Sequence, residues 1–451
     1  MGHETATAWA LSLIFANAEW TPQGLESAAV KSFGWRKSRG WLGRLAAEVV
    51  EAAALPYAPA PATIARLILA AGSFRALELD DEKDPLFDSF SVPLPGFAPA
   101  PPFRDAGIPE METVSALAAW LNLPARHVEW LADVEGYRAA ADSRSTRHYV
   151  RSWVPRRHGP PRLIEAPKPL LKGIQQRILR EILDPIPVHD AAHGFRKGRS
   201  CIGGAARHAG EHVVLCLDLK DFFPTVPIRA VHGLFRSLGY PWPVARILAG
   251  LCSTRTPPDV FDALPFGAFA TSPPDRATDR DWRASFGGRH LPQGAPTSPA
   301  LANLCAWRLD CRLAGLARRA GAAYTRYADD LTFSGDADFA RRAGGFVRAA
   351  SEICADAGFP VHADKTRIMH RHKCQRVTGI VVNRHVNLPR ADYDNLKAIL
   401  TNCIRRGPAT QNRDGAPDFR AHLEGRVAWA EHVNRARGEK LRVLFERIAR
   451  G

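Results

Sequence analysis

Two adjacent carboxylates, Asp329 and Asp330, lie in the middle of a stretch that otherwise favours β-strands. Residues 322–334 are typical of a strand, a tight turn and a second strand, with the aspartates at the turn. Two neighbouring like charges repel each other, and a divalent cation is the usual compensation. An Asp-Asp pair at a turn is nevertheless most often only a solvated turn. The pair therefore predicts a hairpin, and it indicates a site only together with other residues.

A third carboxylate lies at the end of a short apolar run earlier in the chain. Residues 213–219 are apolar except for Asp218, which predicts a buried strand that delivers this carboxylate at its end. With Asp329 and Asp330, it could hold two Mg²⁺ ions about 3.5–4 Å apart, which clamp the attacking and leaving oxygens in phosphoryl transfer. We therefore expect Asp218, Asp329 and Asp330 to be catalytic metal ligands.

Positive charge is concentrated in particular segments of the chain. The net charge of +15 favours a polyanionic partner, nucleic acid first, although an Arg-rich solvated surface is the alternative. Residues 144–180 contain ten Lys or Arg and one acid, Glu165, and the alternating part 149–167 predicts a basic hairpin. Residues 384–451 are also basic, with fourteen Lys or Arg against eight acids. Nucleic-acid contacts are therefore expected in these two regions.

Five further segments accompany the carboxylates in a defined order. They are 162–175, with Arg-Leu-Ile-Glu-Ala-Pro at its start; 193–200, with His-Gly-Phe-Arg; 291–299, with Leu-Pro-Gln-Gly; 358–366, with Gly-Phe-Pro-Val; and 377–383, with Val-Thr-Gly at the start of a strand predicted over 377–382. Together with Tyr-Ala-Asp-Asp at 327–330, they resemble the fingers and palm motifs of reverse transcriptases, and most closely the retron and group II intron branch. The resemblance covers residues 110–451. Retron enzymes often carry Asn-Ala-x-x-His before the Gly-Phe, and residues 189–193 retain only the last His.

The resemblance implies roles for five further residues. Phe223 corresponds to an aromatic gate that rejects a 2′-hydroxyl, and Gln293 should face the incoming nucleotide or the template. Arg162 is matched to an arginine that grips the triphosphate, for which a planar fork is suited. Tyr327 would support the primer terminus, and Lys365 would donate a proton to the pyrophosphate leaving group. The alternatives are core packing for the two aromatic residues, general backbone charge for Arg162 and a solvated lysine for Lys365.

The fold expected from this resemblance is an α+β right hand with fingers, palm and thumb. The palm would be a split βαβ, RRM-like sheet in which the strand ending at Asp218 lies beside the Asp329-Asp330 hairpin. Residues 1–105 would form a helical N-terminal extension of unknown role. Residues 106–383 would form fingers and palm, and residues 384–451 a basic helical thumb.

The resemblance also implies a retron-type RNA-directed DNA polymerase with Mg²⁺ as cofactor. Its partners would be a structured non-coding RNA that serves as template and primer, the DNA product, dNTPs and an effector protein, in antiphage defence. The alternatives are a group II intron-like or unclassified bacterial reverse transcriptase, an RNA-dependent RNA polymerase, or a non-enzymatic RNA-binding scaffold with a vestigial site. The three intact carboxylates, Gln293 and Phe223 favour an enzyme. RNA polymerases of this type usually carry Gly before the Asp pair, whereas Ala328 stands here.

Cysteine usage and hydropathy indicate a cytoplasmic protein. None of the eight cysteines forms a C-x-x-C pair, so we expect buried thiols in a reducing compartment rather than a zinc site or disulfides. The apolar run 8–16 has no Lys or Arg before it, which disfavours a signal peptide. No apolar stretch reaches the length of about 20 residues that a membrane span needs.

Overall fold

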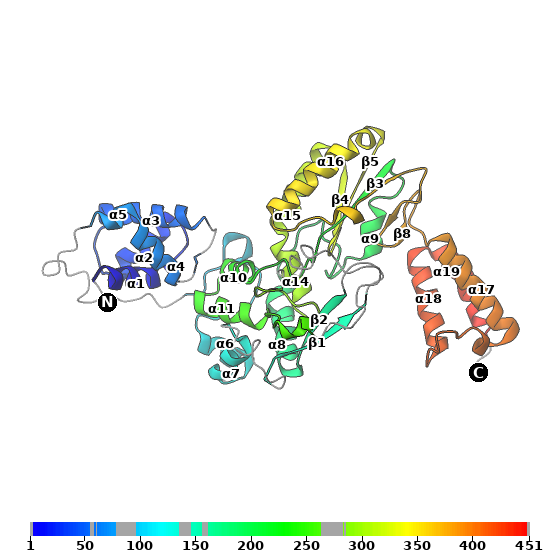
Figure 1. The fold of residues 1–451 in the computed structure, drawn as a ribbon, viewed down its shortest axis with the longest axis horizontal. Coiled ribbons are helices and arrows are strands. Elements are labelled where there is room, and N and C mark those ends of the chain that lie inside the picture. Colours follow the sequence, from blue (N-terminus) through cyan, green and yellow to red (C-terminus); the bar gives the residue numbers. More distant parts are fainter. Residues whose placement is uncertain are drawn as a thin grey trace. The chain divides into compact units, whose positions relative to one another are not determined.

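The chain combines helices with antiparallel sheets, as the α+β expectation requires (Figure 1). The computed structural model describes residues 3–54, 58–59, 61–77, 96–134, 146–155, 161–262, 283 and 286–448. The chain divides into two compact units, one of residues 1–187 with 223–305 and the other of residues 188–222 with 306–451.

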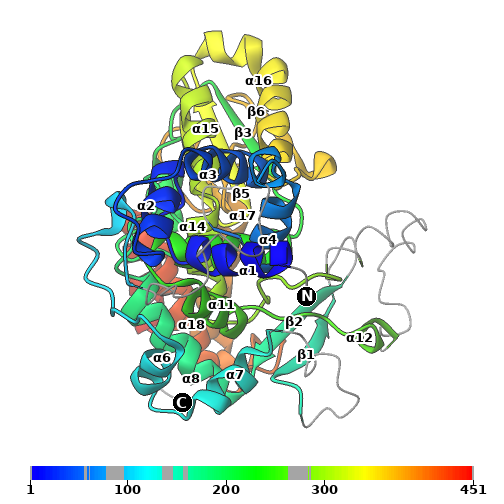
Figure 2. The ribbon, with the colours of Figure 1, turned by 90° about the vertical axis from the view of Figure 1, so that its left-hand side faces the viewer.

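The first unit begins with five helices that share an apolar core of their own (Figure 2). Leu11 and Phe15 of the first helix, Leu45 of the third and Ile64 of the fourth are fully buried in it. The second helix begins at Pro22 because the Thr21 hydroxyl accepts a hydrogen bond from a backbone N–H of its first turn. The helices are α1 (His3–Ala16), α2 (Pro22–Ser32), α3 (Gly40–Ala53), α4 (Pro61–Ala70) and α5 (Gly72–Arg75).

The rest of the first unit is built around the basic hairpin that the sequence predicted. Strands β1 (Tyr149–Val154) and β2 (Arg162–Pro167) pair antiparallel over their full length. The alternation of β2 leaves Arg162 exposed and buries Leu163 and Glu165 on the opposite face. The accompanying helices are η1 (Pro101–Phe103), α6 (Val114–Leu121), α7 (Ala125–Ala132), α8 (Pro169–Ile178), η2 (Leu179–Leu183), α10 (Ile228–Ser237), α11 (Trp242–Leu251), α12 (Asp259–Asp262) and α14 (Ser298–Cys305).

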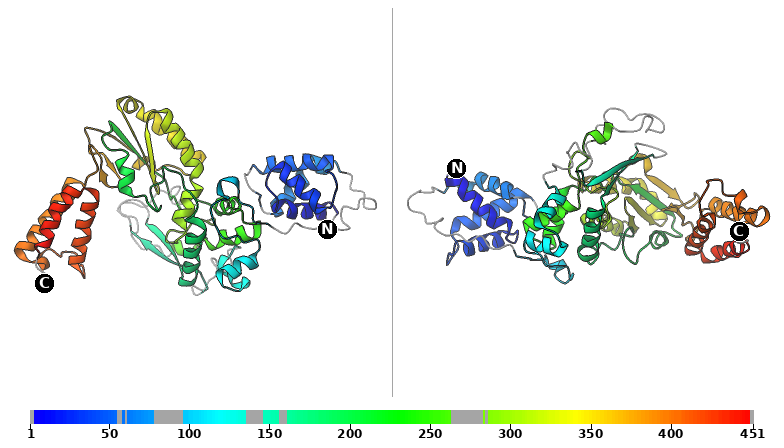
Figure 3. Two further views of the ribbon diagram at one scale, coloured as in Figure 1. Left: turned by 180° about the vertical axis from the view of Figure 1, so that it is seen from behind. Right: turned by 90° about the horizontal axis from the view of Figure 1, so that it is seen from below.

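A four-stranded sheet in the order β4-β5-β3-β6 is the centre of the second unit. Its strands are β3 (Val213–Asp218), β4 (Ala323–Tyr327), β5 (Asp330–Gly335) and β6 (Arg367–His370), and every neighbouring pair is antiparallel. The central strand β3 is buried from Val213 to Leu217, which explains its unbroken apolar run. Helices α15 (Trp307–Arg319) and α16 (Ala337–Asp356) lie along the sheet (Figure 3).

The second unit is completed by a small hairpin and by helices. The predicted strand at 377–382 is divided by a turn at Thr378 and Gly379, both with positive φ, into strands β7 (Arg376–Val377) and β8 (Ile380–Val381). Leu396, Leu423 and Leu441 belong to the core of the three C-terminal helices. The helices are α9 (Cys201–Ala206), η3 (Ala363–Lys365), α17 (Arg390–Arg406), η4 (Pro408–Thr410), α18 (Phe419–Val433) and α19 (Arg435–Glu446).

The prediction of buried cysteines is wrong at two positions. All eight thiols are free, and Cys311 and Cys374 are exposed. Cys311 lies on the solvent side of the amphipathic helix α15, between Asp310 and Arg312 rather than inside an apolar run. Within the described part of the chain, no helix has both the length and the apolar character needed to cross a bilayer.

A fully buried ion pair connects helix α15 to strand β4. The Arg326 guanidinium donates to both carboxylate oxygens of Asp310, at 2.8 Å and 2.6 Å, and neither side chain is exposed. The Tyr324 hydroxyl donates to the same carboxylate at 2.8 Å. Arg326 also donates to the backbone oxygen of Ala328 at 3.2 Å, so the pair supports the turn that precedes Asp329.

Replacing Asp310 with alanine is expected to lower the free energy of unfolding by about 3–5 kcal/mol, because the buried Arg326 cation loses its counter-charge. Urea denaturation measures this loss. The control Asp356→Ala breaks the exposed 3.1 Å ion pair with Arg312 between helices α15 and α16. That change should cost at most about 1 kcal/mol. Equal losses in the two variants would contradict the assignment of a structural role to the buried pair.

Candidate active site

Two of the predicted carboxylates face each other at the ends of adjacent strands. Asp218 is the last residue of β3 and Asp330 the first of β5, and the two are register partners in the sheet. The backbone N–H of Leu219 donates to the backbone carbonyl oxygen of Asp329 at 2.9 Å, which connects the hairpin turn to the end of β3. Ala328 enters this turn with a φ of 55°, a conformation that few non-glycine residues adopt. Asp218, Asp329 and Asp330 are thus brought together as the sequence predicted.

Lys365 is held beside the first of these carboxylates. Its ammonium group lies 2.8 Å from Asp218 Oδ2. Two hydrogen bonds between backbone groups fix the segment that carries this lysine. The His362 N–H donates to the carbonyl oxygen of Asp218 at 2.7 Å, and the Lys220 N–H donates to the carbonyl oxygen of Pro360 at 2.8 Å. The lysine therefore belongs to the carboxylate cluster by geometry as well as by sequence order.

Asp218, Asp330 and Lys365 line a cavity of about 270 Å³ within the second unit. Its polar lining consists of Asp218, Asp330, Asp364, Lys365 and Arg367. Sequence reasoning did not single out Arg367, although it directly follows the segment 358–366. Its position at the start of β6, the strand beside β3, places a second cation in the cavity. The cavity can accept an anionic ligand with metal ions, since it offers both carboxylates and cations.

The other predicted site residues have different surroundings. Tyr327, also in the second unit, is half-buried, and its ring centroid lies 6.1 Å from that of Phe195. Arg162, Phe223 and Gln293 belong to the first unit. Arg162 is exposed, whereas Phe223 and Gln293 are half-buried.

Residues 154–382 match the family model described as reverse transcriptase (RNA-dependent DNA polymerase). This chain belongs to the reverse transcriptase family. It is 44% identical over 298 residues to the retron Mx65 reverse transcriptase of Myxococcus xanthus, covering 65% of this chain and 64% of that protein. It is 36% identical over 370 residues to the retron Mx162 reverse transcriptase of the same organism, covering 79% and 70%. It is 32% identical over 241 residues to the retron Ec86 reverse transcriptase of Escherichia coli, covering 52% and 63%.

These relatives assign the reverse transcriptase to the retron type. The chain spans slightly less than two thirds of the Mx65 and Ec86 proteins. The family match includes Asp218, Asp329, Asp330 and Lys365, and it begins after the N-terminal helices. The predicted family is thus confirmed, including its branch, despite the altered residues before His193.

The carboxylates of this reverse transcriptase fit the divalent metal ions that the family generally uses. Among the described residues, no three His, Cys, Asp or Glu side chains converge into a ready-made metal cage. Mg²⁺ does not require one, because it usually keeps several waters and binds through one or two carboxylates plus substrate phosphates. The oxygens of Asp218 and Asp330 on a shared cavity offer that donor set.

The charge balance at Asp330 points in the same direction. Burial, together with the negative charges of Asp329 and Asp218, raises the pKa of this carboxyl to about 6. Arg367 and Lys365 oppose the shift without cancelling it. A bound cation would relieve this repulsion, so the ionised form of the cluster favours metal binding.

In metal-free protein, Asp330→Asn is expected to increase stability at alkaline pH. The pKa of Asp330 in the folded state, about 6, lies above the ordinary value of 3.8, so the folded state loses stability as the pH rises from about 4 to about 6 and carries the full penalty above that range. Removing the charge should raise the free energy of unfolding by up to about 3 kcal/mol at pH ~8 and change it little at pH ~4. Urea denaturation in chelator at both pH values measures the difference. The exposed Asp364→Asn is the control, and a loss of stability in Asp330→Asn at pH ~8 would contradict the charge assignment.

Proposed function

We propose that this chain catalyses RNA-directed DNA synthesis of the retron type, copying a structured non-coding RNA into DNA by two-metal phosphoryl transfer. The observation that carries the proposal is the register pairing of Asp218 with Asp330, with Asp329 at the adjoining turn, inside the segment that matches the reverse transcriptase family. Two Mg²⁺ ions held by these carboxylates would activate the primer hydroxyl and neutralise charge on the triphosphate.

Lys365 is proposed as the proton donor to the pyrophosphate leaving group. Its ammonium group lines the carboxylate cavity, 2.8 Å from Asp218, where a triphosphate held by the metal ions would lie within reach. Arg367, on the same cavity, would add positive charge opposite the phosphates. Tyr327 would support the primer terminus, and its half-buried ring beside Phe195 is consistent with a packed but accessible platform.

Three residues of the first unit are proposed to bind the nucleotide. Phe223 would exclude a 2′-hydroxyl, and its half-burial, in contrast to the buried Phe222 before it, supports a ring that can face a ligand. The exposed guanidinium of Arg162 would grip the triphosphate. Gln293 would face the nucleotide or the template from a loop in which Gly294 has a φ of 126°.

A right-hand polymerase architecture is proposed for the chain. The hairpin β1–β2 and helix α8 would belong to the fingers and the sheet β4-β5-β3-β6 to the palm, within residues 106–383. Helices α17, α18 and α19 would form the thumb within residues 384–451, and residues 1–105 a helical extension. A cavity of about 380 Å³ in the helical region is lined by Tyr393, His422, Arg426 and Trp429, among others. These side chains suit contacts to RNA bases and phosphates.

The proposed partners are a non-coding RNA that is both template and primer, its DNA product, dNTPs and an effector protein in antiphage defence. Names of the relatives support the retron assignment, since all three are retron reverse transcriptases. The eight free thiols support a reducing, cytoplasmic setting. A non-enzymatic RNA scaffold is disfavoured because the carboxylates are intact and share a cavity with Lys365 and Arg367.

Purified protein is expected to incorporate dNTPs on an RNA template only with a divalent metal. Asp329→Asn or Asp330→Asn should abolish incorporation, a loss of at least about a thousandfold, because the ions that stabilise the developing charge lose a ligand. Primer extension with labelled dNTP measures this. Asp364→Asn, at the rim of the same cavity, is the control and should retain activity. Wild-type rates in Asp329→Asn or Asp330→Asn would refute the assignment.

Phe223→Ala is expected to weaken discrimination against ribonucleotides, because the space under the sugar opens for a 2′-hydroxyl. The ratio of kcat/KM for a dNTP to that for the matching rNTP should fall by at least about tenfold. Phe222→Leu is the neighbouring control, since Phe222 packs against Phe359 with ring centroids 5.7 Å apart. An unchanged ratio in Phe223→Ala would place the gate at another residue.

A further inference from the structure

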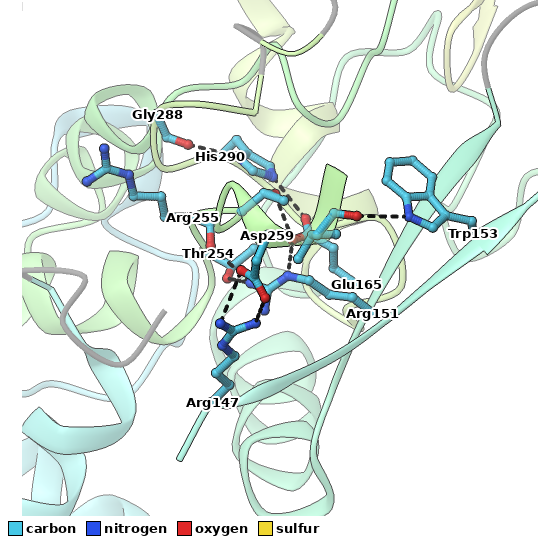
Figure 4. A network of polar contacts seen from close by, with 11 residues as sticks. Arg147, Arg151, Trp153, Glu165, Thr254, Arg255, Asp259, Gly288 and His290 are labelled. Atoms are coloured by element: carbon cyan, nitrogen blue, oxygen red, sulfur yellow. Dashed lines mark hydrogen bonds and ion pairs between the residues drawn. The ribbon is translucent and has the colours of Figure 1, made fainter. Parts of the chain in front are cut away.

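A buried polar network in the first unit is centred on Glu165 of strand β2 (Figure 4). One carboxylate oxygen accepts from Arg151 Nε and from the Thr256 hydroxyl, both at 2.9 Å. The other lies 2.9 Å from His290 Nε2. The side chains of Glu165 and His290 are each only 1% exposed, so water does not satisfy these groups. Glu165 is also the single acid among the ten basic residues of 144–180.

The partners of His290 fix its protonation state. Its Nδ1 lies 2.8 Å from the backbone oxygen of Gly288, and a carbonyl oxygen can only accept. Its Nε2 faces the Glu165 carboxylate, which also only accepts when ionised. Burial opposes ionisation of Glu165, but the hydrogen bonds and charges of His290 and Arg151 outweigh it and hold the pKa of this carboxyl below its ordinary value. Hydrogen bonds from the His290 ring to both the Gly288 carbonyl and an ionised Glu165 require a proton on each ring nitrogen.

The same network joins two elements that are proposed to bind the nucleotide. The backbone N–H of Glu165 donates to the backbone carbonyl oxygen of Gln293 at 2.7 Å. A Cβ added to Gly294 would lie 3.1 Å from the backbone carbonyl oxygen of Glu165, so the loop and the strand are closely packed. The backbone of His290 pairs with that of Thr254 in both directions, at 2.9 Å and 3.0 Å. Strand β2 carries Arg162 on its opposite, exposed face, so Glu165 connects the Arg162 strand to the Gln293 loop.

We propose that Glu165 and the imidazolium of His290 form a positioning pair that fixes the Gln293 loop on strand β2 and thereby sets the affinity for the incoming nucleotide. When the ring loses a proton, one of its two nitrogens faces an acceptor without a hydrogen, and the loop is held less firmly against the strand. Nucleotide binding consequently weakens at alkaline pH. The inference rests on the proposed function, because that function gives Gln293 and Arg162 their roles.

Several other charged or titratable groups surround the pair. The Arg151 guanidinium, besides its bond to Glu165, donates to the Thr254 hydroxyl at 3.1 Å and to the Arg255 oxygen at 2.9 Å. Arg255 Nε donates to the Gly287 oxygen at 3.1 Å. Two further groups lie close to Glu165 or Arg151: the Tyr149 phenol, whose pKa is raised by burial, and the Arg147–Asp259 pair, joined at 2.9 Å.

The variant Glu165→Gln tests whether the charge of Glu165 positions the Gln293 loop or whether the side chain only fills space. The amide oxygen can still accept from Arg151 and Thr256, while the amide N–H₂ now donates to His290 Nε2. That arrangement requires a neutral ring protonated at Nδ1, so the variant no longer needs the second proton. His290→Gln is the complementary variant, in which a group that does not titrate donates to Glu165. If Glu165→Gln is unstable because Arg151 has lost its charged partner, His290→Gln still tests the proposal.

The KM for dNTP and kcat are measured on an RNA template-primer between pH ~6.5 and ~9. In wild type, KM should rise about fivefold across the titration, equivalent to the roughly 1 kcal/mol of one hydrogen bond, while kcat changes less. In Glu165→Gln and His290→Gln, KM should not vary with pH. The control Thr256→Val removes a neutral hydrogen bond to the same carboxylate and should keep the wild-type pH dependence. A KM that rises with pH equally in wild type and in either Gln variant would overturn the proposal.

The ring itself is observed by ¹⁵N NMR of histidine-labelled protein without substrates. The His290 resonances, assigned by their loss in His290→Gln, should show two protonated ring nitrogens near neutral pH in wild type and one in Glu165→Gln. A singly protonated ring in wild type would refute the positioning pair. Because this measurement needs no DNA synthesis, it distinguishes failure of the pair from failure of the proposed polymerase function.

Discussion

Repulsion between carboxylates placed at the ends of two paired strands is the constraint on which the rest of the site depends. The register of β3 with β5 brings Asp218 opposite Asp330, and burial adds to the cost of ionising the latter. The surrounding structure offsets this cost with positive charge. Lys365 lies 2.8 Å from Asp218, and Arg367 lines the same cavity. The strained turn at Ala328 is held in place by the buried Arg326–Asp310 pair.

A similar principle of charge pairing recurs in the first unit with a different outcome. There a single carboxylate, Glu165, is surrounded by cations and hydroxyl donors, so it stays ionised although it is buried. Its task is to hold a loop against a strand rather than to bind metal. The carboxylates in the second unit face an open cavity and carry negative charge that is not fully compensated. Glu165, in contrast, has a hydrogen-bond partner on each carboxylate oxygen. The difference between a candidate metal site and a structural network thus lies in how completely each acid is paired.

Much of the fold could be predicted from the sequence because its signals are local. The apolar run of β3, the alternation of β1 and β2 and the turn before Asp330 each follow from a short segment. Contacts between distant segments could not be predicted in this way. The Arg326–Asp310 pair joins a helix to a strand, and the exposure of Cys311 depends on which face of α15 packs. The division of 377–382 into two strands depends on positive φ at Thr378, which the residue type does not indicate.

The candidate site follows the same distinction. Asp218, Asp329 and Asp330 were found because their neighbours form motifs, and Arg367 was missed because only the pairing of β6 with β3 brings it to the cavity.

The central claim is that these three carboxylates hold catalytic metal ions. Anomalous X-ray diffraction from crystals of the chain with RNA template, primer, dNTP and Mn²⁺ tests it most directly. The account predicts two peaks about 3.5–4 Å apart, bound by Asp218 and the Asp329-Asp330 pair. Strong peaks elsewhere in a complex with bound dNTP, with none at these carboxylates, would contradict it.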